Sequence, residues 1–264
     1  TAQSYESVIY FGTNSGYLHA MTTDIDGPEE LFAYVPYELL SNIEVYYREG
    51  AEYGKHYGLD GPITAFIHND TELEAGKTSS KSLIGASDKA YMYAGMRRGG
   101  EGYYALNVTN PRQPEYLWQI TSDDTGFERL GQTWSAMKPI YVSPEAIGID
   151  VEPEDSKPMP VLVFGGGYDP SEDDTSGGTR ISHSRGNAIY MVNALTGELL
   201  WTASPDSSAE LTVNGMTNSI VSDITAIDND GNGTTDILYA ADTGGRIWRI
   251  DLFSDSNPKA TEIA

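Results

Sequence analysis

The sequence contains no cysteine and few histidines. The missing thiols exclude disulfides, thiolate nucleophiles and cysteine-based zinc sites. The four histidines do not recur at the helical spacing that a His-based metal site uses, so that kind of site has no support. The histidines are His19, His56, His68 and His183.

Long apolar runs are also missing. Hydrophobic residues make up 39% of the chain, and none of its apolar runs reaches the 18 or more residues that would span a bilayer. The opening stretch TAQSYESVIYFG lacks the basic and then apolar layout of a signal peptide. We therefore expect no membrane span in this chain. Either the mature chain begins here or the chain is a piece of a longer protein, and we expect the second.

Basic residues are scarce. The chain has 16 Lys and Arg against 39 Asp and Glu, which gives a net charge of −23 and an isoelectric point near 4.3. A surface this acidic repels phosphate backbones, so we do not expect nucleic acid as a partner. It suits a protein that meets divalent cations, although acidic charge also simply keeps a surface protein in solution.

Glycine and tyrosine are abundant, with 28 and 18 residues, and the chain is divided into short segments rich in β-branched and aromatic residues. Gly, Asn, Asp or Pro bounds each segment. That pattern predicts many short antiparallel strands and an all-β fold. Only brief helical pieces are expected, such as the stretch at residues 36–54.

Four segments share one plan: an apolar strand, a turn of small residues and a second strand. They are Val8–Met21, Ala90–Val108, Val161–Trp201 and Ile237–Leu252. Such units, recurring every several tens of residues, predict a modified β-propeller with short helical insertions, while a β-sandwich is the alternative. At roughly 45 residues per blade, we expect about five or six blades' worth of sequence in an incomplete ring. Exposed insertions are expected at residues 69–80 and 171–185.

The stretch DNDGNGTTD at residues 228–236 alternates oxygen-bearing residues with glycine in the manner of a calcium loop. Gly233 allows the sharp turn that folds alternate residues inward. The twelfth position of the loop is Tyr239, so the bidentate Glu of an EF-hand is missing, and the alternative is a polar turn. The predicted ligands are Asp228, Asp230, Asn232, Asp236 and the backbone carbonyl of Thr234.

Three other features are weaker. The acidic stretch at residues 22–30 has poor ligand spacing and is predicted to be a plain turn. The basic stretch RRGG at residues 97–100 is either a contact point or a solvated turn. The tryptophans are predicted to pack in the core between sheets; they are Trp118, Trp134, Trp201 and Trp248.

An ordered set of motifs covers nearly the whole chain: VIYFGTNSGYLHAM, ELFAYVP, YGLDGPI, GGEGYYALNVTNP, LW, LGQTWSAMKP, VFGGGYDP, YMVNALTGELL and SDITAIDNDGNGTTDILYAADTGGRIWRIDL. In this order they resemble the C-terminal propeller domain of the PilY family, which comprises type IV pilus biogenesis factors and tip-associated adhesins. We therefore interpret residues 1–264 as one PilY-like propeller domain.

The resemblance implies a non-enzymatic module at the cell surface, at the pilus tip. Its implied partners are the minor pilins of the type IV pilus and host or surface receptors. It implies that Ca²⁺ in the loop at residues 228–236 controls pilus extension against retraction. The family's large N-terminal region, often with a von Willebrand A-like domain, has no counterpart here, so adhesive specificity does not carry over.

Two other functions fit parts of the sequence. A quinoprotein-like dehydrogenase would use pyrroloquinoline quinone and calcium on similar blades, but its ion draws ligands from separate blades and not from one contiguous loop. A scaffold propeller of an outer-membrane assembly machine would fit the repeats without needing the calcium loop.

Overall fold

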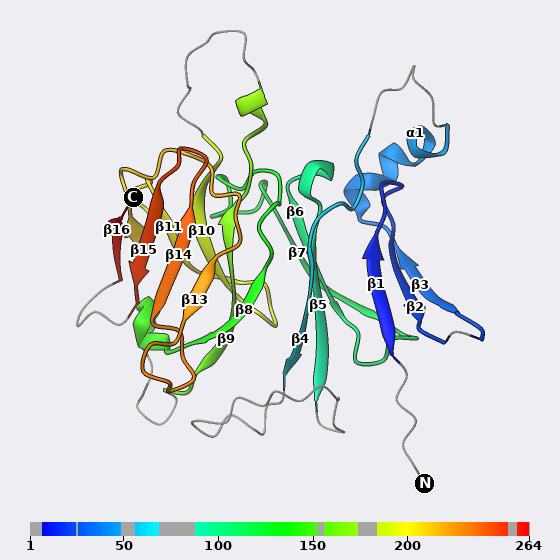
Figure 1. Cartoon of the computed structure of the whole chain (residues 1–264), viewed down its shortest axis with the longest axis horizontal. Coiled ribbons are helices and arrows are strands. Elements are labelled where there is room, and N and C mark those ends of the chain that lie inside the picture. The colour runs from blue at the N-terminus through cyan, green and yellow to red at the C-terminus, as the bar shows by residue number, and fades with distance from the viewer. Residues whose placement is uncertain are drawn as a thin grey trace.

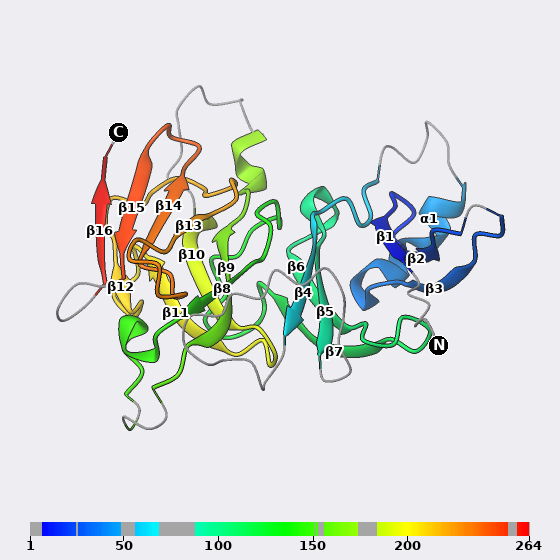
Figure 2. The ribbon, with the colours of Figure 1, turned by 60° about the horizontal axis from the view of Figure 1, so that its bottom comes forward.

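A computed structural model describes residues 7–24, 26–48, 56–68, 88–150, 152, 156–173, 184–252 and 258–263. These residues form four β-sheets that follow one another along the chain. Figures 1 and 2 show the sheets side by side, from blue at the N-terminal end to red at the C-terminal end, in an arc that does not close into a ring. This is the propeller-type, all-β architecture that the sequence predicts.

The first two sheets are antiparallel and keep the chain order. The first sheet contains β1 (Val8–Gly12), β2 (Leu18–Thr22) and β3 (Glu30–Tyr34). The second sheet contains β4 (Ile63–His68), β5 (Lys89–Gly95), β6 (Gly102–Asn107) and β7 (Glu115–Thr121).

The third sheet contains β8 (Lys138–Val142), β9 (Met159–Gly166), β10 (Gly186–Asn193) and β11 (Leu199–Ser204), with β12 (Leu211–Thr212) paired parallel to β11 at the edge. The fourth sheet contains β13 (Thr225–Ile227), β14 (Ile237–Ala241), β15 (Ile247–Asp251) and β16 (Lys259–Glu262).

Helical structure in the described residues is brief, as expected. The 3₁₀ helix η1 (Tyr37–Asn42) runs directly into α1 (Ile43–Arg48), which places a helix inside the predicted stretch. Three further 3₁₀ turns are η2 (Arg97–Gly99), η3 (Pro144–Ile147) and η4 (Pro170–Asp173). None of these helices has the length and the apolar composition needed to cross a bilayer.

The sequence repeat marks two adjacent strands in each sheet. The four repeat segments contain β1–β2, β5–β6, β9–β10 and β14–β15, and in the last three sheets another strand precedes the pair. The described residues form four sheets, fewer than the five or six blades for which the chain has enough length, because long connections such as residues 122–137 and 213–224 use up chain between them. Of the expected insertions, residues 69–80 lie outside the described part, and residues 171–185 fall only partly inside it.

The core consists of three hydrophobic clusters, one at each junction between consecutive sheets. Alternate residues of a strand point to opposite faces. On β6, Tyr104 therefore packs against the first sheet, while Tyr103 packs against the third. On β9, Phe164 packs against the second sheet, while Val163 packs against the fourth. A two-layer β-sandwich would have one core between two sheets, so that alternative is wrong.

Three of the four tryptophans lie in this core as predicted: Trp118, Trp201 and Trp248 are at most 7% exposed. Trp134 contradicts the prediction. It lies on the connection between β7 and β8, is half-buried and belongs to none of the three clusters.

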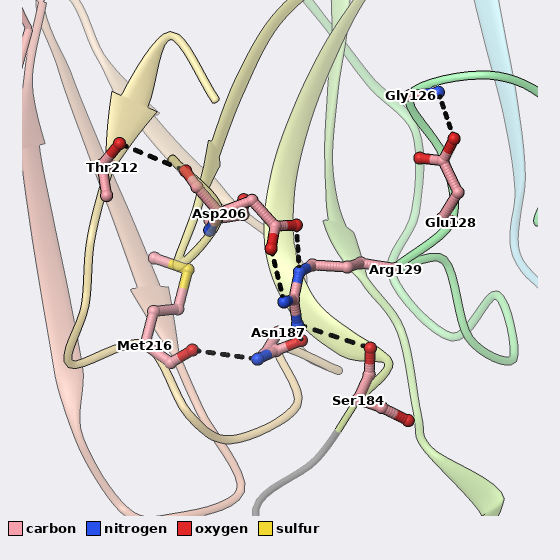
Figure 3. A network of polar contacts seen from close by, with 9 residues as sticks. Gly126, Glu128, Arg129, Ser184, Asn187, Asp206, Thr212 and Met216 are labelled. Carbon is pink, nitrogen blue, oxygen red and sulfur yellow. Dashed lines mark hydrogen bonds and ion pairs between the residues drawn. The ribbon is translucent and has the colours of Figure 1, made fainter. Parts of the chain in front are cut away.

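An arginine on the connection from β7 to β8 joins the second sheet to the third. The guanidinium of Arg129 donates two hydrogen bonds to the carboxylate of Asp206, of which the bond from Nη2 to Oδ1 is 2.7 Å long, and its Nη1 donates to Asn187 Oδ1 at 2.9 Å (Figure 3). Asn187 Nδ2 in turn donates to the carbonyl of Met216 at 3.1 Å. This network fixes the connection against β10 and the loop after β11.

We predict that Asp206→Asn lowers the free energy of unfolding at pH 7 by about 0.5–1 kcal/mol, because the pair is partly exposed and water screens it. The Arg129 guanidinium holds the pKa of Asp206 below its ordinary value of 3.8. The pair's contribution is therefore complete above that value and is lost as the pH falls through the lower pKa of the folded protein. Denaturant unfolding between pH 2 and pH 7 measures this contribution to the free energy of unfolding.

In that experiment the difference in the free energy of unfolding between wild type and Asp206→Asn is expected to disappear at the acidic end of the pH range. Asp123→Asn is the matched control, because Asp123 is exposed and forms no ion pair within the described residues. A constant difference across the pH range would contradict the ion-pair explanation.

Candidate metal centre

The predicted calcium loop forms the connection between β13 and β14, which pair in antiparallel register from Thr225↔Tyr239 to Ile227↔Ile237. In Figure 1 it is the orange loop at the lower end of the fourth sheet. Because strands and not helices flank the loop, the structure agrees with the sequence in excluding an EF-hand.

Three carboxylates of the loop lie together. Asp228, Asp230 and Asp236 each place one carboxylate oxygen within 4.8 Å of the others. Asp228 and Asp230 are exposed, whereas Asp236 is only 9% exposed. Within the described residues, this is the one group of three or more His, Cys, Asp or Glu side chains with metal-binding geometry.

Two glycines give the loop its curvature. Gly231 and Gly233 have φ angles of +77° and +91°, which other residues adopt only with strain. Their amides donate to the two carboxylate oxygens of Asp228 at 2.7 and 2.8 Å. These hydrogen bonds, with Gly233 contributing most, hold the pKa of Asp228 below its ordinary value. The carboxylate is therefore ionised well below neutral pH.

The other two predicted ligands, Asn232 and the Thr234 carbonyl, lie in the same loop, where the two residues are hydrogen-bonded to each other. Asn232 Oδ1 accepts hydrogen bonds from the Thr234 amide at 2.7 Å and from the Thr234 hydroxyl at 2.6 Å. The amide nitrogen of Asn232 donates to Asp230 at 3.1 Å. Their roles as metal ligands stay predictions.

The end of the loop is anchored to two sheets. The amide of Thr235 donates to the carbonyl of Tyr141 on β8 at 2.7 Å, which ties the loop to the third sheet. The carbonyl of Asp236 accepts from the amide of Leu252 at 2.7 Å, and its carboxylate accepts from Asn229 at 2.6 Å. Sequence reasoning missed Tyr141 and Leu252, because nothing in a local motif indicates contacts this far along the chain.

All the ligands that the loop offers are oxygens, and three of them are carboxylates. Hard cations such as Ca²⁺ prefer this kind of ligand set and tolerate irregular geometry. The residues therefore fit the predicted ion. By contrast, the described acidic residues of the stretch at residues 22–30 form no such cluster: the Glu29 amide donates to Thr22 Oγ1, and the Asp26 amide donates to Asp24.

Curated relatives and a solved structure are similar to this chain over most of its length. A type IV pilus biogenesis factor PilY1 homolog of Xylella fastidiosa is 30% identical over 256 residues, which are 97% of this chain. The chain is a relative of the PilY1 proteins. PilY1 of Pseudomonas aeruginosa strain PAO1 is 25% identical over 263 residues, covering 93% of the chain. This confirms the resemblance that the ordered motifs indicate.

The likeness extends to structure. The crystal structure of the Pseudomonas aeruginosa PilY1 C-terminal domain matches 93% of this chain with a TM-score of 0.55 and 22% identity. The PilY1-related chain covers 38% of that domain and only 17% of each of the two relatives. No protein-family model matches the chain.

We predict that Asp230→Asn does not destabilise the metal-free protein. The substitution removes one of three neighbouring like charges and keeps an oxygen to accept the amide of Asn232, so we expect the free energy of unfolding to rise or to change by less than about 0.5 kcal/mol. Any gain is expected to shrink in high salt, which screens exposed charges. Thermal unfolding in the presence of a chelator measures the change in stability. A clear loss of stability would contradict the view that the three carboxylates repel one another in the metal-free protein.

Proposed function

We propose that this chain is a calcium-binding, non-enzymatic module of a type IV pilus biogenesis factor, placed at the cell surface at the pilus tip. In this role it supports pilus assembly, the balance of extension and retraction, and adhesion, with minor pilins and surface receptors as partners. The observation that supports the proposal is the convergence of Asp228, Asp230 and Asp236 in a chain related to PilY1 over nearly its whole length.

Asp228, Asp230 and Asp236 would hold the ion, with Asn232 and the Thr234 carbonyl completing the oxygen set. When bound, the ion supplies positive charge that cancels the repulsion between the carboxylates. The chain transmits the effect, because Asp236 is hydrogen-bonded to Ile227 and Leu252, and the neighbouring Thr235 is bonded to Tyr141 of the third sheet. An ordered loop therefore holds β14 more firmly against its neighbours.

This arrangement couples two binding events. A ligand that binds only the folded, ordered loop stabilises that form by mass action. A protein partner that recognises the ordered loop would then bind more tightly as the calcium concentration rises, and by reciprocity its binding would raise calcium affinity. Regulation of the pilus by calcium would follow from this coupling.

We predict that Ca²⁺ binds the wild-type chain with one site and raises its unfolding midpoint, and that Asp230→Ala removes both effects. Calorimetric titration and thermal unfolding measure them, with Mg²⁺ as a competing ion. Asp24→Ala is the matched control, because Asp24 also lies in an exposed acidic turn but outside the cluster. If wild type and Asp230→Ala take up calcium equally, the site assignment fails.

The same titration with added pyrroloquinoline quinone tests the enzymatic alternative. We expect quinone to change neither calcium uptake nor the reduction of an artificial electron acceptor. Quinone-dependent activity would overturn the non-enzymatic assignment.

In cells, we predict that Asp236→Ala in the full-length parent protein changes surface piliation and twitching motility, and that it abolishes their dependence on calcium. Asp236 is chosen because it joins the carboxylate cluster to β13 and to the end of β15. Piliation is measured by shearing and immunoblotting, and motility by the diameter of the twitching zone, at several calcium concentrations. Unchanged piliation and motility, with the Asp24→Ala control matching wild type, would remove the regulatory part of the proposal.

A further inference from the structure

A cavity of about 490 Å³ lies where three inter-sheet connections meet, and we call it the junction cavity. Its walls are residues 60–62, which precede β4, Trp134, which precedes β8, and residues 221–223, which precede β13. Arg97, on the turn η2 between β5 and β6, completes the wall. The volume is within the range of about 300–1,000 Å³ that ligand sites in proteins occupy.

Arg97 and Arg98 differ from the other arginines that the structure describes, because neither guanidinium forms an ion pair or a side-chain hydrogen bond. The ion-paired arginines of the described residues are Arg48, Arg112, Arg129, Arg185, Arg246 and Arg249. With 39 acidic against 16 basic residues, the chain has carboxylates in excess. The two arginines are therefore unpaired because of where they are held, and not because carboxylates are scarce.

Trp134 contacts both guanidinium groups, of which only that of Arg97 belongs to the cavity wall, while that of Arg98 also lies 5.5 Å from the ring centre of Tyr57. The Arg97 guanidinium carbon lies 4.3 Å from the centre of the Trp134 ring, and that of Arg98 lies 5.5 Å from it. Cation–π contact orients each group without using its N–H donors. The ring itself is fixed by a hydrogen bond of 3.3 Å from its nitrogen to Gln132 Oε1. Two like charges with free donors are thus gathered at one aromatic ring.

A buried threonine fixes Arg97 and Trp134 relative to each other. Thr133 is fully buried, and its hydroxyl oxygen accepts from the amide of Met96 at 2.7 Å and from that of Arg97 at 3.2 Å, while it donates to the Gly102 carbonyl at 3.0 Å. Arg97 has a φ of +53°, a conformation that glycine adopts more easily than arginine. A bulky charged residue at a glycine-like position is typical of a functional constraint.

We propose that Arg97, held by Trp134 in the wall of the junction cavity, binds a carboxylate group of a peptide segment there, and that Arg98 adds positive charge beside the same ring. A planar guanidinium binds a carboxylate through two parallel N–H···O bonds, and one bound anion would relieve the repulsion between the two arginines. The sequence alternatives for residues 97–100 were a contact point and a solvated turn, and the geometry favours the contact point.

The other charges of the cavity define the ligand more narrowly. Asp60 and Asp223 also line it, and Asp223 Oδ1 already accepts from the Ala136 amide at 2.7 Å. Their carboxylates disfavour a doubly charged phosphate and can accept N–H groups, which a peptide backbone supplies. Within a Debye length of about 8 Å, where charges are least screened, the acidic surface of this chain, whose net charge is −23, repels further negative charges on a ligand. The fitting ligand is therefore an extended peptide with one isolated Asp or Glu, and not a polyacidic one.

This site is independent of the calcium loop. Residues 221–223 precede β13, whereas residues 228–236 follow it, so the cavity and the loop lie at opposite ends of that strand. In Figure 1 the turn between β5 and β6 lies at the upper end of the sheets, and the loop lies at the lower end. Either proposal can fail without the other.

The test uses the 264-residue chain and two capped synthetic peptides, one with a single Glu between Gly and Ser residues and one with Gln in its place. Calorimetry gives the affinity, and tryptophan fluorescence reports on the site because Trp134 is the one tryptophan outside the core clusters. We expect the Glu peptide to bind with saturation and to change the emission, and the Gln peptide to bind at least about tenfold more weakly, since it lacks the charge.

Variants separate binding from folding. Arg97→Gln and Arg98→Gln are expected to weaken the Glu peptide about tenfold or more, while Arg112→Gln, which removes an ion-paired arginine outside the cavity, leaves affinity unchanged. Arg97→Gly is expected to abolish binding of the Glu peptide. Its unfolding midpoint is expected to stay the same or to rise, because glycine adopts the positive φ at this position without strain. Trp134→Phe is expected to lose the emission change.

Three results would overturn the proposal. The first is equal binding of the Glu and Gln peptides, or no binding of either. The second is a lower unfolding midpoint in Arg97→Gly together with lost binding, which would assign Arg97 a structural role. The third is binding of inorganic phosphate or of a poly-Glu peptide as tight as that of the single-Glu peptide, which would make the cavity a general anion site.

Discussion

The structure depends on one constraint, which is that the middle sheets bury both of their faces. Each central strand sends alternate side chains into two different cores, so Tyr103 and Tyr104 stabilise different junctions although they are neighbours in sequence. Each hydrophobic core is shared by two consecutive sheets. The position of each middle sheet is set by the sheets before and after it. The Arg129 network and the wall of the junction cavity lie largely on connections between sheets, where the chain has to pass from one core to the next.

The strand pattern and the repeat could be read from the sequence, because alternation and glycine-rich turns are local properties. The number of sheets could not. The connection that carries Phe127 and Leu130 contributes apolar residues to a core without forming a strand, so chain length gave a poor estimate of blade number. The sandwich alternative could be rejected only from the structure, because short antiparallel strands joined by tight turns occur in both folds.

The candidate metal site was predictable in part for the same reason. The spacing of Asp228, Asp230 and Asp236 brings their carboxylates together within one short loop. The bond from Thr235 to Tyr141 crosses between sheets and leaves no local signal. Trp134 was placed in the core by its residue type, yet it contacts two arginines, one of which belongs to the wall of a cavity. Those arginines come from the turn between β5 and β6, which is distant from Trp134 in the sequence.

The repeat in the sequence and the sheet in space have different boundaries. Each repeat begins at the second strand of its sheet in the last three sheets, while the first strand, β4, β8 or β13, is reached through the preceding connection. If the chain were cut at a repeat boundary, for a deletion or a circular permutation, one sheet would lose its first strand and the neighbouring sheet would gain an extra strand. A whole-sheet unit has to be cut just before β4, β8 or β13. The residues at these three points form walls of the junction cavity. Exchanging any of the last three sheets as a unit would therefore require the cavity to be rebuilt.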